Sequence, residues 1–252
     1  MAIETIIMLV LVILGALMVF KVTKSILKAV FLAVSVILLI VIIGGYFVVS
    51  DANDFREKFP SQPSIYLLKD DEKIIAGFSG ILEENFTPSP ALEEQINSYQ
   101  YDYEQKNLNK ILGENYKLFI MNKSAFDFVN EVSAGEKPLA KQEIFDLLDS
   151  SMPINDYLSK QGIPDSQKSK ARQDLLAQMN IKDDTEFKGI LFGLLYATAM
   201  SKEGPLFMFD QVRNENMIVY PETAMFKLLK QIPSSFIQNI ATKIKKGEEK
   251  SQ

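Results

Sequence analysis

The sequence predicts an α+β protein with a membrane anchor, and three observations lead to this fold class. Two long stretches without a charged side chain fall within the first fifty residues, as is typical of membrane-spanning helices. Two runs rich in β-branched and aromatic residues follow at residues 64–69 and 73–82, which is the pattern of a β-hairpin. From residue 124 onward, apolar residues recur at helical spacing between prolines. We therefore expect an N-terminal two-helix transmembrane hairpin, then a small β-β-α-β sheet unit and a mainly helical C-terminal half.

The hairpin is expected over residues 1–49, with spans at about residues 5–20 and 29–49. These stretches hold sixteen and twenty-one uncharged residues, and a helix needs about 20 residues to cross a bilayer. Backbone groups in lipid must be paired within the segment, so each stretch is expected to be a helix. A cleaved signal peptide is disfavoured for the first stretch, because its N-terminal region carries Glu4 and no basic side chain. One unbroken helix through both stretches would be about 67 Å long, and half of its apolar length would then lie in water.

The basic residues around the hairpin predict its orientation. Lys21, Lys24 and Lys28 cluster at the tip, whereas the flank after the second span offers only Arg56 and Lys58 among several acidic residues. Lys and Arg are enriched in cytoplasmic loops, and acidic residues count for little in this rule. We therefore expect the tip in the cytoplasm and the large domain on the extracytoplasmic side.

Small residues suggest how the two arms of the hairpin pack. Ser25, Ala29 and Ala33 repeat at every fourth position, and Gly15 and Ala16 lie at a similar depth on the other arm. Small residues on one face let helices approach closely in lipid. The same face could bind another membrane or envelope protein, or the spacing could arise by chance because alanine is common in such helices. The expected partners are thus the lipid bilayer and another membrane or envelope protein.

A juxtamembrane neck is expected over residues 50–63, with Phe55 and Phe59 on the membrane surface. The soluble α+β domain is expected over residues 64–246, and a disordered tail over residues 247–252. In this domain we expect one helix between Ser89 as N-cap and Gly113, with Leu92, Ile96, Tyr99 and Tyr103 on its buried side, and a strand at 116–121. Further helices are expected at 124–132, 141–149, 153–161, 165–179, 184–201, 221–231 and 234–246, and short strands at 206–209 and 217–220.

Composition excludes several classes of function. Residues 1–49 carry three of the 27 Lys and Arg and one of the 32 Asp and Glu, which leaves the rest of the chain with a net charge of −7. Nucleic acid is not expected as a partner, because neutralising phosphates needs a basic surface. The chain has no Cys and no His, so it lacks thiol nucleophiles, the usual general base and the commonest transition-metal ligand. We predict no cofactor, no metal and no catalytic residue.

The most apolar segment outside the hairpin is residues 187–200. It is too short to span a bilayer, and it is expected to be the central core helix of the domain, since buried helices are often apolar all round. The alternative is that it forms the wall of an apolar-ligand cavity. The residues of this segment that would line such a cavity are Gly189, Phe192, Gly193, Tyr196 and Ala197.

Several short patterns match functional motifs only in part. Residues 77–81 lack the last glycine of a nucleophile elbow and fall within a predicted strand. Acidic runs at 70–72 and 183–186 do not match a calcium loop, and they are expected to be a solvated turn and a helix start. Asn85 and Asn122 each begin a glycosylation pattern, and Asn122 is the better candidate because Pro88 follows the first pattern.

These observations favour a membrane-anchored, non-enzymatic interaction or scaffold protein that presents an extracytoplasmic α+β domain as part of an envelope complex. One alternative is a module that binds lipid or another apolar ligand through the 187–200 helix. The other is a hydrolase built on carboxylates or on a Ser/Lys pair. Ser25 and Lys28 have the spacing of such a dyad, but the topological role of the basic cluster already explains Lys28, and the spacing is taken as chance.

Overall fold

The computed structural model describes residues 26–81, 88–133, 138–204 and 206–232. The chain divides into two compact units, Met1–Asp54 and Phe55–Gln252, and each is considered by itself. In the first unit the described chain belongs to helix α2, Ile26–Lys58, whose last residues extend into the second unit.

Helix α2 is long and apolar enough to cross a membrane from Val34 onward. Only 6% of its most apolar window is buried, and side chains such as Ile40 and Val41 are more than 60% exposed. A core helix of a soluble protein would bury this surface. The structure therefore shows one candidate membrane span among the described residues, and not a two-helix hairpin. The other predicted span, residues 5–20, lies outside the described residues.

The residues predicted to orient and pack the hairpin are only partly described. Helix α2 includes Lys28, Ala29 and Ala33. The remaining members of both predicted sets lie outside the described residues: Gly15, Ala16, Lys21, Lys24 and Ser25. Packing and orientation of the hairpin stay predictions.

The predicted neck is corrected by the course of α2. Most of residues 50–63 are helical, because α2 continues to Lys58. Phe55 and Phe59 do not lie on a membrane surface; they are at most 8% exposed and stack on each other at 4.5 Å within the second unit. Phe59 also meets the ring of Phe119 edge-on at 5.6 Å. Phe55 and Phe59 therefore pack into the core of the domain, where their apolar area is removed from water, instead of lying at the membrane surface.

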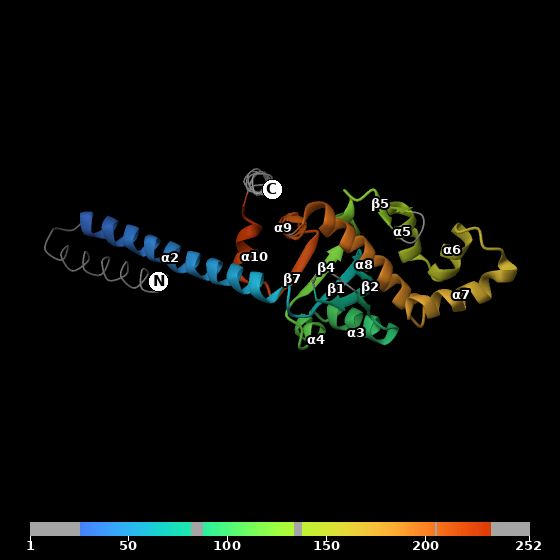
Figure 1. The fold of residues 1–252 in the computed structure, drawn as a ribbon. Helices are drawn as coiled ribbons and strands as arrows, with labels where there is room; N and C mark the ends of the chain where they lie inside the picture. The colour runs from blue at the N-terminus through green and yellow to red at the C-terminus, as the bar shows by residue number, and fades with distance from the viewer. Residues whose placement is uncertain (1–25, 82–87, 134–137, 205, 233–252) are drawn as a thin grey trace. The chain divides into compact units, whose positions relative to one another are not determined.

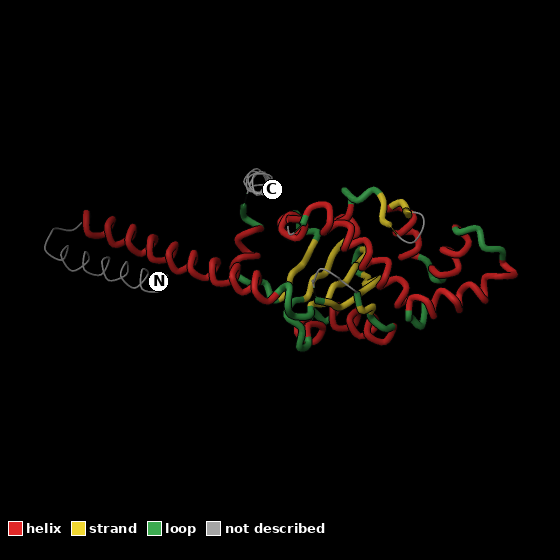
Figure 2. The backbone as a smooth tube through the Cα atoms, in the orientation of Figure 1, coloured by secondary structure: helices red, strands yellow, loops and turns green. Residues whose placement is uncertain are grey.

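The second unit is built on a five-stranded sheet in the order β3-β2-β1-β4-β7 (Figure 2). Strands β1 and β4 are parallel, and the other neighbouring pairs are antiparallel. Together with its helices, this sheet confirms the α+β class. The strands are β1 (Ser64–Asp70), β2 (Lys73–Gly80), β3 (Ser89–Pro90), β4 (Leu118–Asn122) and β7 (Met217–Tyr220).

Helices cover both faces of this sheet (Figure 1). On one face, aliphatic side chains of β1, β2 and β4 pack beneath α3 (Glu93–Glu104) and α4 (Leu108–Leu112). On the other, α8 (Asp184–Glu203) packs against β2 and β3. Strand β1 is therefore buried on both sides, since the successive residues Leu67 and Leu68, whose side chains point to opposite faces, are both fully buried.

The core beneath α8 is aromatic. Tyr66 of β1 stacks on Phe78 at 4.7 Å and on Phe119 at 5.2 Å, and its ring centre lies 4.8 Å from that of Tyr196 in α8. Burial raises the pKa of the Tyr66 phenol, although the Tyr196 and Ser64 side chains oppose the shift. Burial also raises the pKa of Tyr196, and neighbouring Tyr66 adds to this shift.

These two phenols predict alkaline instability. Because their pKa values are raised in the folded state, their contribution to stability is complete below the ordinary tyrosine pKa of about 10 and is lost as the pH rises above it. We expect the domain to unfold at a lower denaturant concentration above pH 10, with Tyr66 and Tyr196 ionising only as it unfolds. Circular dichroism and phenolate absorbance, followed together in the full chain and in Tyr66→Phe, measure this. Ionisation of all nine tyrosines before any loss of ellipticity would contradict it.

Four of the predicted helices in the C-terminal half are confirmed closely, and α10 is shorter than the helix predicted at 221–231. Helices α5, α6 and α7 match predicted helices to within one residue, and α8 extends two residues beyond its predicted end. Their bounds are α5 (Lys141–Asp149), α6 (Pro153–Lys160), α7 (Asp165–Met179), α9 (Leu206–Arg213) and α10 (Ala224–Leu229). The predicted helix at 234–246 and the predicted tail at 247–252 lie outside the described residues.

Four predictions of local structure were wrong. Residues 89–90 form edge strand β3 rather than a helix start, and the predicted helix is split into α3 and α4, with Lys106 between them at a φ of 55°. Leu92 is 40% exposed instead of buried. Residues 206–209 begin helix α9, not a strand. In place of a helix at 124–132 there are a 3₁₀ turn, Lys123–Phe126, and strand β5, Glu131–Ser133, which pairs with β6, Pro138–Ala140.

Candidate functional site

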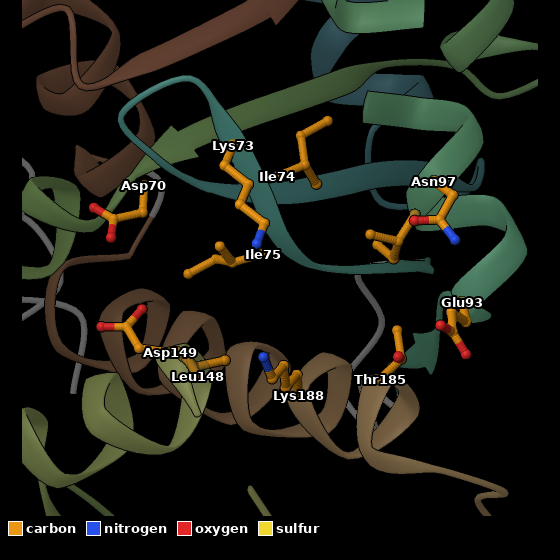
Figure 3. Close-up of a pocket in the computed structure, with 11 residues that line it drawn as sticks. Asp70, Lys73, Ile74, Ile75, Glu93, Asn97, Leu148, Asp149, Thr185 and Lys188 are labelled. Carbon is orange, nitrogen blue, oxygen red and sulfur yellow. The ribbon is translucent and has the colours of Figure 1, made fainter. Parts of the chain in front are cut away.

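A polar pocket of about 400 Å³ lies between β2, α3, the end of α5 and the first half of α8. Figure 3 shows Lys73 of β2 and Lys188 of α8 reaching into it from opposite walls. Asp70 and Asp149 lie toward one end of the view, and Thr185, Glu93 and Asn97 toward the other. We call this hollow the two-lysine pocket.

The two lysines are held in this position by regular structure. Lys73 begins β2, directly after the tight turn in which Asp71 has a φ of 51°. Lys188 lies in the second turn of α8 and is half-buried. Burial lowers the pKa of Lys188, and the positive charge of Lys73 lowers it further, while Asp149 and Asp184 oppose these effects. The two ammonium groups therefore repel each other across the pocket.

The carboxylates at one end of the pocket are already engaged by a third lysine. Lys123 Nζ lies 2.7 Å from Asp70 Oδ2 and also pairs with Asp149 Oδ1. Burial acts to lower the pKa of Lys123, but its hydrogen bonds to Asp149 and Asp70 raise the pKa above its ordinary value. Neither Asp70 nor Asp149 forms an ion pair with Lys73 or Lys188 within the described chain.

The other carboxylate near Lys188 is engaged as well. Arg172 of α7 binds Asp184 through two parallel hydrogen bonds, of 3.1 and 2.7 Å. Asp184 also accepts a hydrogen bond from the Ile154 backbone N–H. Its bond to Arg172 raises the pKa of the guanidinium, despite partial burial. Both acids that favour the charged form of Lys188 thus have another cation as their partner.

The two acidic runs of the sequence lie at a turn between strands and at the start of a helix. Asp70 ends β1, and Asp71 and Glu72 form the turn that leads to β2. Asp183 is the N-cap of α8 and accepts a hydrogen bond from the Glu186 backbone N–H at 2.9 Å, as acidic residues at helix starts commonly do. Over the described ranges, no three His, Cys, Asp or Glu side chains come together in a way that could hold a metal ion.

The proposed apolar-ligand wall on α8 faces protein atoms. A Cβ atom on Gly189 would lie 2.7 Å from the Gly77 carbonyl oxygen, and one on Gly193 would lie 2.7 Å from the Pro88 ring. Phe192 and Tyr196 are buried in the aromatic core, and Ala197 is half-buried. A bound apolar ligand at these residues stays a prediction.

A larger hollow, of about 820 Å³, lies where α7 ends and α8 begins. Glu186 lines it and is only 5% exposed, and its Oε1 has no hydrogen-bond partner in the described part of the chain. Asn122, the candidate glycosylation site, is half-buried at the end of β4. Modification of Asn122 stays a prediction.

Sequence reasoning missed the two-lysine pocket, because its cations come from distant parts of the chain and neither lies in a recognisable motif. Comparison of the chain with protein-family models, curated proteins and solved structures finds no significant match.

Proposed function

We propose that this protein is a membrane-anchored interaction protein that presents its α+β domain on the extracytoplasmic side, as part of an envelope complex. The observation that carries the proposal is the exposed apolar surface of α2. From Val34 to Val49 it exposes a series of large apolar side chains all round the helix, and a surface of this kind in water would promote aggregation. The hydrocarbon core of a bilayer is the environment in which this apolar surface is stable.

The proposed anchor has two spans. Residues 5–20 carry no charge, and Lys21, Lys24 and Lys28 separate them from the second apolar stretch. A basic tip of this kind favours the cytoplasmic side, which puts the domain on the opposite side. A binding role rather than catalysis is supported by the absence of Cys and His from the sequence, because these residues supply most nucleophiles and general bases near neutral pH.

The number of spans is tested by inserting charge into α2. In Ile40→Lys/Val41→Lys, each lysine at the centre of the span costs about 2.5 to 3.5 kcal/mol of insertion free energy. If residues 5–20 form a second span, the variant stays in the membrane pellet after alkaline carbonate washing, but its domain moves to the cytoplasmic side. Protease protection and a reporter fused to the C-terminus measure the side. Ile40→Leu/Val41→Leu, which keeps the stretch apolar and adds no charge, is the control and leaves the topology unchanged.

Two results would contradict the anchor as proposed. Release of the double variant into the wash would mean that α2 is the single span. An N-terminus of the mature wild-type chain beyond residue 20, determined by mass spectrometry, would mean that the first stretch is a signal sequence. The interaction role requires that the wild-type chain migrate with a partner after gentle solubilisation, and migration alone would count against it.

A further inference from the structure

We infer that the two-lysine pocket binds a small organic carboxylate, with the carboxylate group between Lys73 and Lys188 and an apolar portion against the isoleucines of the pocket wall. This site is independent of the membrane topology proposed above, since all its residues belong to the second unit.

The charges of the two lysines favour an anionic ligand. Lys73 and Lys188 enter from opposite walls, and neither lysine side chain has a hydrogen bond or ion pair to another residue of the described chain. The acids near Lys188 are bound by Lys123 and Arg172. Two cations that face each other without an anion between them are destabilising, and a bound anion removes the repulsion.

The number of negative charges favours a carboxylate over a phosphate. Three acidic residues line the pocket, namely Asp70, Asp149 and Glu93, and they repel a second negative charge on a ligand more strongly than a single one. A carboxylate carries one charge and can accept a hydrogen bond from each lysine.

The remaining lining defines the rest of the ligand. Ile74, Ile75 and Ile96 offer apolar contacts, and the Thr185 hydroxyl and Asn97 amide offer hydrogen bonds. A volume of about 400 Å³ lies within the usual range of small-molecule sites, roughly 300 to 1,000 Å³. A short, branched carboxylic acid fits both the size and the chemistry.

The test uses the full chain in mild detergent and two probes of the same shape, 4-methylpentanoate and the neutral 4-methylpentanamide. At ten times its Kd, we expect 4-methylpentanoate to raise the Tm of the domain by about 3 to 6 °C. The amide should have little effect, because it lacks the charge. Lys188→Met and Lys73→Met keep the aliphatic stem and should abolish the shift, whereas Lys170→Met, on the exposed surface of α7, should keep it.

A second measurement needs no variant and covers the case in which Lys188→Met fails to fold. In the wild-type chain, 4-methylpentanoate should slow the acetylation of Lys73 and Lys188 by acetic anhydride, read by peptide mass spectrometry, and leave Lys170 unaffected. Absence of both the Tm shift and this protection overturns the inference. An equal shift with the amide, or a shift retained in Lys188→Met, also overturns it. Inorganic phosphate that acts as strongly as the carboxylate would replace the carboxylate site by a general anion site.

Discussion

Replacing Phe192 by alanine is expected to cost about 3 to 5 kcal/mol of the free energy of unfolding, the usual range for a fully buried phenylalanine. Phe192 is 0% exposed. Its ring centre lies 5.0 Å from that of Phe78 in β2 and 6.0 Å from that of Phe126. Truncation would remove these contacts and leave a cavity beneath α8, where α8 packs against the sheet.

Denaturant unfolding of the full chain, followed by circular dichroism, measures this cost. Phe128→Ala is the matched control: Phe128 is half-buried and its ring contacts Phe207 at 5.6 Å. It should lose no more than about half as much stability, because less apolar area returns to water. A loss below about 1 kcal/mol in Phe192→Ala would mean that the space beneath α8 is not closely packed, and it would favour the alternative of an apolar-ligand cavity.

Local sequence signals predicted the helices that have residues typical of helix ends at their boundaries. Pro164 directly precedes α7, and Asn180 ends it in the left-handed conformation with a φ of 52°. Both residue types act at helix ends through their own backbone geometry, without help from distant contacts. The bounds of α7 were therefore readable from the sequence alone.

Signals of the same kind failed where tertiary pairing decides the structure. Ser89 followed by Pro90 is typical of a helix start, but these residues pair with Ser79 and Phe78 as an edge strand. Proline is accepted at a sheet edge, where a backbone N–H is not required. The apolar run 206–209 was equally ambiguous, since a short run of this kind suits a strand or a buried helix.

The candidate site was beyond sequence reasoning for a related reason. Lys73 and Lys188 each look like an ordinary surface lysine when read in their local sequence. The packing of α8 on β2 brings the two lysines into one pocket. The acids nearby pair with Lys123 and Arg172 instead, so neither Lys73 nor Lys188 has an acidic partner. The candidate membrane span in α2 is the opposite case, because a long apolar run can be recognised in the sequence without any tertiary information.

Packing of α8 on β2 depends on a glycine at position 189, and this gives the second large expected effect. A Cβ atom there would lie 2.7 Å from the Gly77 carbonyl oxygen and 2.7 Å from Pro90 Cβ. The first atom belongs to the backbone and the second to a rigid ring, so neither can move aside as the end of a flexible side chain would. Gly189→Val should therefore force the helix away from the sheet and destabilise the domain by about 3 kcal/mol or more.

The sign of the smaller substitution separates this contact from helix propensity. In a helix without such a neighbour, glycine to alanine stabilises by about 1 kcal/mol; Gly189→Ala should instead destabilise, because the clash outweighs that gain. Ala197→Val places the same branched side chain at a half-buried position of α8 and should change the free energy of unfolding by less than about 1 kcal/mol. Denaturant midpoints of the three variants decide the matter. A stabilised Gly189→Ala would show that α8 and β2 do not approach as closely as the Gly189–Gly77 contact requires, and the same approach forms the two-lysine pocket.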